Sequence, residues 1–165
     1  MPAAVKQQKM AVAYFRCVEG TGFYDKVISW YSRSRFTHAE LHWPLTDIHP
    51  AGYLGAQTSG GVQIRPANYL NGMFMVFGVR VTPSQLAQIE TIARAQVGLP
   101  YDWKAIAAMG LSWLRGPVST KSWFCSELVA YCFSQAGVPL LRVPSSKSDV
   151  LTPRDLSIST VAKVF

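Results

Sequence analysis

The order of two kinds of reactive residue constrains the fold of this chain most. All three histidines, His38, His42 and His49, precede Cys125, which stands in the segment Phe124-Cys125-Ser126-Glu127-Leu128-Val129, where a helix is expected to begin. A cysteine at the start of a helix is a candidate thiolate nucleophile, and an imidazole is its usual base. A fold that uses this cysteine must therefore bring a histidine from the first third of the chain to a helix near its end.

Length and composition predict one globular domain over residues 1–165, since 49% of the residues are hydrophobic and 15% are charged. The longest apolar runs fall short of the roughly 20 residues that a membrane-spanning helix needs. Residues 1–9 carry positive charge without an apolar signal core. We therefore expect a protein that is cytoplasmic as synthesised, with delivery by a phage particle or a secretion apparatus left open.

The net charge of +7 favours contact with acidic surfaces such as anionic lipid, a cell-wall polymer or nucleic acid. The sixteen Lys and Arg residues are scattered, however, and no nucleic-acid-binding motif accompanies them. We expect no dedicated nucleic-acid function. Nothing in the pattern indicates the oligomeric state.

Strand and helix patterns alternate along the chain without repeats. The segment Thr82-Pro83-Ser84-Gln85 combines a capping hydroxyl, a proline at the first helical position and a glutamine three residues after the cap, which predicts a helix that ends before Gly98. The other predicted helices cover 23–31, 104–114 and a segment from about Ser122 to Gly137, and the predicted strands cover 10–18, 37–43, 53–57, 62–65 and 73–81.

The helix that carries Cys125 has one apolar face, formed by Cys125, Leu128, Val129, Cys132 and Phe133. Cys125 is expected to point inward from the first turn, where unpaired backbone N–H groups and the helix dipole favour a thiolate. The alternative is that Cys125 is a small buried hydrophobic residue. That is the prediction for Cys132 and Cys17. Seven residues separate Cys125 from Cys132, about 10 Å along a helix, which is beyond disulfide reach.

Three polar residues, His38, Glu40 and His42, alternate with apolar ones and would share one face of a strand. Such a face borders either solvent or a functional site. A His-x-Glu-x-His strand also supplies zinc ligands, with His49 or Cys17 as further donors. Ligands at strand spacing rarely converge on one ion, so the metal interpretation ranks below the others.

Two short motifs resemble a known family. Gly98-x-Pro100-Tyr101-x-Trp103, followed by Phe124-Cys125-Ser126-x-Leu128-Val129-x-Tyr131, is similar to the nucleophile region of NlpC-type cysteine peptidases, whose papain-like fold sets the cysteine helix against an antiparallel sheet. In ordinary members the histidine strand follows that helix. Here Thr37-His38-Ala39-Glu40-Leu41 precedes it, as in the circularly permuted branch of YiiX-like proteins and lecithin retinol acyltransferase relatives. The resemblance covers residues 10–155 and implies an α+β fold with an antiparallel sheet packed against a helical layer.

The resemblance makes Cys125 the nucleophile and His38 its base. The backbone N–H groups of Cys125 and Ser126 would form part of an oxyanion hole. Tyr101 matches a family tyrosine near the site and would contact substrate, although a packed aromatic ring with its hydroxyl at the rim is an equal alternative.

The group that orients His38 has two candidates. In the family it is a polar side chain on the strand after the histidine strand, which here is Gln57. Permuted relatives often carry glutamate or histidine there, so a glutamine departs from the pattern. Glu40, on the same face as His38, is the alternative.

The resulting prediction is a cysteine hydrolase that cleaves an amide or ester bond through a thioester, without a cofactor or metal. By family resemblance, a peptidoglycan stem peptide is the leading substrate, for an endopeptidase or amidase, and a lipid acyl group is the second. A non-catalytic binding or structural module of a larger assembly is the alternative from another class. A metal hydrolase using His38, Glu40 and His42 comes third.

Overall fold

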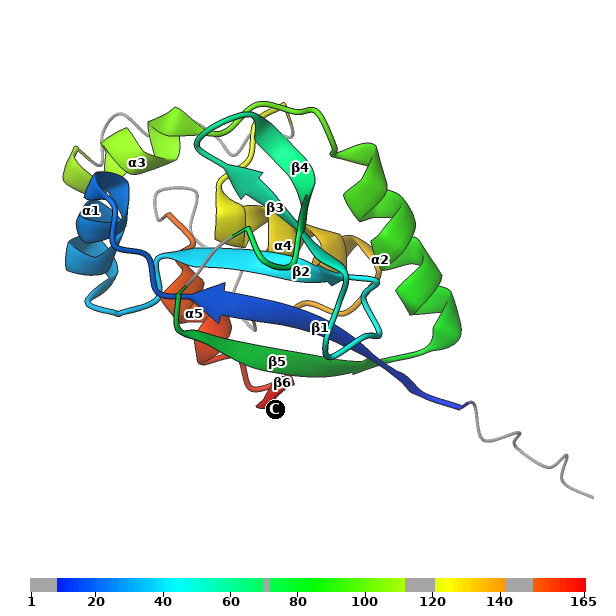
Figure 1. Cartoon of the computed structure of the whole chain (residues 1–165). Helices are drawn as coiled ribbons and strands as arrows, with labels where there is room; N and C mark the ends of the chain where they lie inside the picture. The colour runs from blue at the N-terminus through cyan, green and yellow to red at the C-terminus, as the bar shows by residue number, and fades with distance from the viewer. Residues whose placement is uncertain (1–8, 70–71, 112–120, 142–149) are drawn as a thin grey trace, which may run out of the picture.

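The computed structural model describes residues 9–69, 72–111, 121–141 and 150–165 (Figure 1). The strands are β1 (Ala11–Val18), β2 (His38–Trp43), β3 (Gly52–Gln57), β4 (Gly61–Pro66), β5 (Phe74–Val81) and β6 (Ala162–Val164). The helices are α1 (Phe23–Ser32), α2 (Pro83–Ala95), α3 (Trp103–Gly110), α4 (Cys125–Gln135) and α5 (Pro153–Ser157).

The strands form a single sheet in the order β4-β3-β2-β1-β5-β6, with every neighbouring pair antiparallel. Strand β1 lies in the middle, and its register against β2 sets Arg16 opposite Glu40 and Val18 opposite His38. The mixed α+β class with an antiparallel sheet is therefore confirmed.

Helices α2 and α4 pack on one face of the sheet, which Figure 1 shows from the opposite side. The apolar alternation of the strands directs Phe15, Leu41 and Leu54 into this fully buried layer. Phe15 stacks on Phe77 of β5 at 5.2 Å between ring centroids and meets Phe133 of α4 edge-on at 6.1 Å. These rings join sheet to helix, and each fully buried Phe side chain stabilises the fold by about 2 to 3 kcal/mol.

The capping box predicted for α2 is confirmed. The Thr82 hydroxyl accepts a bond from the Gln85 N–H at 3.2 Å, and the Gln85 side chain accepts one from the Thr82 N–H at 2.9 Å. The helix ends at Ala95, ahead of Gly98, whose φ of +91° is in the left-handed region that favours glycine.

Two predicted helices begin or end elsewhere. Helix α4 begins at Cys125 instead of Ser122, because Trp123 is extended and pairs its N–H with the Pro100 carbonyl at 3.0 Å and its carbonyl with the Asp102 N–H at 2.9 Å. Helix α3 ends at Gly110, and the rest of its predicted range beyond Leu111 lies outside the described residues.

Helix α5 and strand β6 were not predicted from the sequence. Thr152 and Asp155 form a capping box at α5, with a proline at its first position, which is the pattern that marks α2. That signal was present and could have identified α5. Strand β6 has only three residues and pairs with β5 at the edge of the sheet, where short strands carry little pattern.

No helix among the described residues is long and apolar enough to cross a membrane.

Candidate active site

Cys125 is the first residue of α4 and is fully buried. The extended pairing of Trp123 with the segment around Pro100 fixes where this helix begins. Its Sγ lies 4.0 Å from the carbonyl oxygen of Thr37, the residue just before β2. The first N–H groups of a helix have no acceptor within it, so the backbone N–H groups of Cys125 and Ser126 are available beside the sulfur.

His38 is the first residue of β2 and directly follows Thr37, and Cys125 is one of the groups that act on the pKa of its imidazole. A bond from the Thr37 N–H to the Val18 carbonyl, 2.9 Å long, fixes the chain just before it. The His38 side chain is 14% exposed, so solvent reaches the imidazole. The structure thus brings together the two side chains that the sequence pointed to, across 87 positions of the chain.

Glu40 lies on the other side of the imidazole. Its Oε1 is 3.1 Å from His38 Nε2, and its Oε2 accepts two bonds from Arg16, from Nε at 3.0 Å and Nη2 at 2.8 Å. Both Glu40 and His42 are fully buried, so the alternative of a solvated face for this strand is wrong. Because Nε2 of His38 faces Glu40, Nδ1 is the nitrogen left for the thiol.

Gln57, the last residue of β3, also contacts His38. Its Nε2 lies 2.8 Å from His38 Nε2, 2.8 Å from Glu40 Oε1 and 2.6 Å from the Tyr69 hydroxyl. If Gln57 were the acceptor for His38, its side-chain oxygen would lie there, and the structure places the nitrogen instead. Glu40 is the physical reason for this orientation. Its carboxylate only accepts hydrogen bonds, so the NH₂ end of the Gln57 amide, which donates them, faces it.

Arg16 and Tyr69 belong to this cluster but were not identified from the sequence. The Tyr69 hydroxyl donates a hydrogen bond to Glu40 Oε1, and the Arg16 guanidinium lies 3.2 Å from the ring centroid of Tyr53. Arg16 is the one charged residue of β1, and an isolated charge in an apolar strand was a usable signal. Tyr69 follows β4 in a turn and carried no such signal.

Close packing holds Glu40 in this position. A Cβ on Gly55 of β3 would lie 2.9 Å from Glu40 Cγ, so a larger residue would displace the carboxylate.

Charge pairing sets the protonation of the two central groups. Burial alone would lower the pKa of His38, but the Glu40 carboxylate and the nearby Cys125 raise it to about 10. Burial would raise the pKa of Glu40, but His38 and Arg16 lower it to about 2. At neutral pH the pair is therefore an imidazolium beside a carboxylate.

Comparison with solved structures shows which fold this is. The crystal structure of YiiX from Escherichia coli O157:H7 superposes with a TM-score of 0.71 at 15% sequence identity, over 94% of this chain and 96% of that one. The chain has a YiiX-like fold. No protein-family model matches the sequence, and no curated protein does.

YiiX is described as a metalloprotein, so we tested whether the residues here could hold a metal. Among the described residues, no three His, Cys, Asp or Glu side chains form a group that could do so. His42 Nδ1 lies 2.8 Å from the Asp47 carbonyl oxygen, and its ring packs edge-on against Tyr53. The third-ranked alternative, a zinc set of His38, Glu40 and His42, is therefore not supported among these residues.

The other two cysteines are core residues. Cys132 is fully buried, and burial raises the pKa of its thiol to about 12. Cys17 is buried with its Sγ 3.5 Å from the Pro153 carbonyl, and burial together with the nearby Cys125 raises its pKa as well. Thiols held protonated in this way are unreactive, as expected for core residues.

Tyr101 is buried beside Cys125. Its ring contacts Trp103 at 5.2 Å and Phe124 at 6.0 Å between centroids. Burial, and then the charge on Cys125, raise the pKa of the hydroxyl, so Tyr101 is a neutral donor at the site.

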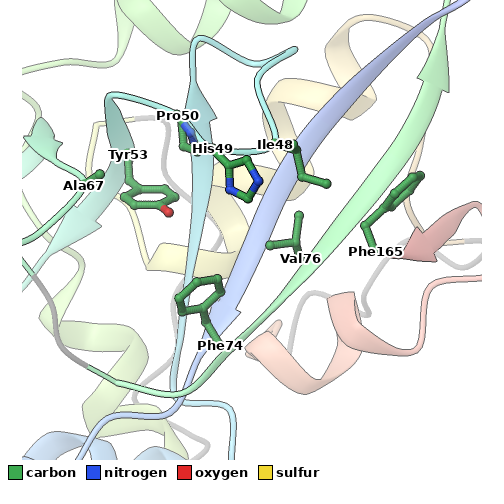
Figure 2. Close-up of a pocket in the computed structure, with 8 residues that line it drawn as sticks. All are labelled: Ile48, His49, Pro50, Tyr53, Ala67, Phe74, Val76 and Phe165. Carbon is green, nitrogen blue, oxygen red and sulfur yellow. The ribbon is translucent and has the colours of Figure 1, made fainter.

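A separate cavity of about 390 Å³ lies on the face of the sheet that α2 and α4 leave uncovered (Figure 2). It is lined by Ile48, His49, Pro50, Tyr53, Ala67, Phe74, Val76 and Phe165. His49 lies here, away from Cys125, and Tyr53 links the cavity wall to Arg16.

Proposed function

We propose that this protein is a cysteine hydrolase that cleaves an amide or ester bond through a thioester, and that its YiiX-like fold is a circularly permuted NlpC-type, papain-like domain over residues 1–165. The observation that carries the proposal is the His38 imidazole, which pairs with Glu40 at 3.1 Å and directly follows Thr37, whose carbonyl oxygen lies 4.0 Å from the Cys125 Sγ at the start of α4.

The first step is acylation. In the resting pair His38 already holds the proton as an imidazolium, and the Cys125 sulfur reacts as a thiolate. The sulfur attacks the carbonyl carbon of the substrate, so that a C–S bond forms and the carbonyl oxygen becomes an oxyanion. The backbone N–H groups of Cys125 and Ser126 bind that oxyanion, at about 3 kcal/mol of transition-state stabilisation for each donor. The C–N or C–O bond then breaks, and His38 returns the proton to the leaving group.

The second step is hydrolysis of the thioester. His38 removes a proton from water, the resulting oxygen attacks the acyl carbon, and the C–S bond breaks to release a carboxylic acid. In both steps Glu40 fixes the imidazole with Nδ1 towards the sulfur, the orienting role that an acceptor plays in triads. Gln57 is a positioning residue, because it acts on the imidazole chiefly through Glu40.

A peptidoglycan stem peptide is the leading substrate, on the resemblance of the two motifs to NlpC-type peptidases. A lipid acyl ester is the second, and the exposed aromatic rings next to Tyr101 favour it. No oligomeric partner or cofactor enters either scheme.

Alkylation of the native protein tests the proposal. Iodoacetamide at neutral pH should add one group to the wild type and to Cys132→Ala, a matched loss of another buried thiol in α4, and none to Cys125→Ala. His38→Gln should react at least about tenfold more slowly, because the imidazolium that favours the thiolate is gone. An unchanged rate in His38→Gln would show that His38 does not activate the Cys125 thiol. An inert Cys125 in the folded wild type would favour the non-catalytic binding module.

Turnover identifies the substrate class. If a stem peptide is the substrate, purified stem peptides should yield a new amino group. If a lipid ester is the substrate, a short-chain phospholipid should yield free fatty acid. The product should be absent with Cys125→Ala. Turnover that persists in that variant would contradict the cysteine mechanism.

A further inference from the structure

Helices α1 and α3 lie together at one end of the molecule and expose aromatic side chains (Figure 1). Phe23 and Trp30 of α1 are 75% and 74% exposed, and Tyr24 and Trp103 are exposed as well. We call these four residues the aromatic face. Isolated exposed hydrophobic residues are ordinary, but three rings in contact, with Trp30 two turns along the same helix, mark an interaction surface.

The helices are built with apolar residues on their outer sides. In α1 the buried positions are Ile28 and Ser32, whereas Phe23 and Trp30, two turns apart, share the outward side. In α3 the exposed positions are Trp103, Lys104, Ala107 and Gly110, of which only Lys104 is polar. Core packing therefore does not account for these aromatic residues.

Ring contacts make the aromatic face continuous with the candidate active site. Phe23 meets Tyr24 at 5.5 Å between centroids, Tyr24 meets Trp103 at 5.0 Å, and Trp103 meets Tyr101 at 5.2 Å. Tyr101 is buried beside Cys125. One ring contact, between Trp103 and Tyr101, therefore links the aromatic face to the residue beside the thiol.

The exposed charges on these two helices are positive. Lys26 of α1 and Lys104 of α3 are exposed. The acidic groups are half-buried and engaged: Asp25 accepts bonds from the Thr37 hydroxyl at 2.7 Å and the Gly22 N–H at 2.8 Å, and Asp102 caps α3 through the Lys104 N–H at 3.0 Å.

We propose that the aromatic face docks on an anionic lipid surface, with Phe23, Trp30 and Trp103 at the headgroup level and the two lysines against lipid phosphates. Trp and Tyr rings favour the membrane interface, and basic residues near the surface add attraction to anionic lipid. A second copy of the chain fits less well, since a symmetric contact would oppose like charges. The proposal does not depend on the cysteine chemistry, because it concerns only the outer side of α1 and α3.

Vesicle co-sedimentation of the full chain tests this. Wild type should associate with vesicles of phosphatidylcholine and phosphatidylglycerol and only weakly with phosphatidylcholine alone. Trp30→Ser should lower the partition coefficient at least about tenfold, since a buried aromatic side chain is lost from the interface. Lys26→Gln should lower it about fivefold. Cys125→Ala should bind as wild type, which keeps this outcome separate from that of the proposed hydrolase.

Ile158→Ser is the matched control, because Ile158 is 65% exposed but lies after α5, outside the aromatic face. It should bind as wild type, and circular dichroism should show all variants folded. Equal binding by Trp30→Ser and wild type would overturn the proposal, as would equal binding to neutral and anionic vesicles. A dimer in sedimentation velocity that Trp30→Ser abolishes, without vesicle binding, would assign the face to a second copy instead.

Discussion

At the scale of single residues, the candidate site is organised around the Glu40 carboxylate. One oxygen faces His38, Gln57 and Tyr69, and the other takes both bonds from Arg16. A buried charge of this kind is stable only when every lone pair finds a donor. The imidazole orientation therefore depends on residues that touch neither the sulfur nor a substrate.

Replacing Glu40 with glutamine should cost about 3 to 5 kcal/mol of unfolding free energy at pH 7, because it leaves Arg16 as a buried, unpaired cation. Turnover should also fall, since His38 loses its acceptor. Urea unfolding measures the first effect, and the rate of product formation measures the second. A variant as stable as wild type would show that the ion pair is not formed.

Gln57→Ala should be milder than Glu40→Gln in a kinetic comparison. It removes one donor to the carboxylate, at about 1 kcal/mol, and leaves the acceptor in place. Cys125 should stay reactive towards small electrophiles. Tyr69→Phe removes a different donor to the same oxygen and is the matched comparison. A larger loss of activity in Gln57→Ala than in Glu40→Gln would return the orienting role to Gln57.

At the scale of elements, one capping box, the helical spacing of apolar residues and the strand patterns predicted most of the sheet and helices α1 to α4. The start of α4 was misplaced because Trp123 is committed to a long-range pairing with residues 100–102. No local pattern records such a pairing. Cys125 was nevertheless placed in the first turn, since helix spacing alone aligns it with Leu128 and Val129.

Variants of the two cysteines of α4 should differ in their effects, with one affecting turnover and the other the free energy of unfolding. Cys125→Ala should abolish turnover and change the unfolding free energy by no more than about 1 to 2 kcal/mol. Cys132→Gln should destabilise by about 3 kcal/mol or more, because a larger amide is buried without partners two turns into the helix. Urea titrations of both variants provide the measurement. The reverse pattern would mean that the two roles are exchanged.

At the scale of the whole molecule, the sheet brings together residues that are remote in sequence. His38 and Cys125 could be predicted as a pair because each has its own local signal. Arg16 and Tyr69 could not be joined to Glu40 in this way, since their contacts depend on the register of β1 against β2 and on a turn after β4. The register of one strand against another depends on the packing of the whole sheet, which no local sequence pattern records.

Stability should fall as pH rises from 6.5 to about 9. The pKa of His38 is raised from 6.5 to about 10, so its contribution is complete below 6.5 and is lost progressively as the unfolded chain, but not the folded one, gives up the proton. Below about 9 the raised pKa values of the buried thiols do not yet contribute. Unfolding free energies across this range should slope downward in wild type and be nearly flat in His38→Gln.

The complete burial of Cys125 has a kinetic consequence. A reagent cannot meet the sulfur until the packing around it opens, so the observed rate of labelling should level off as reagent concentration rises, at the frequency of that opening. Iodoacetamide and a bulkier maleimide should then reach the same ceiling despite different intrinsic reactivities. The opening rate, as well as the shape of the site, would then limit which molecules react with Cys125.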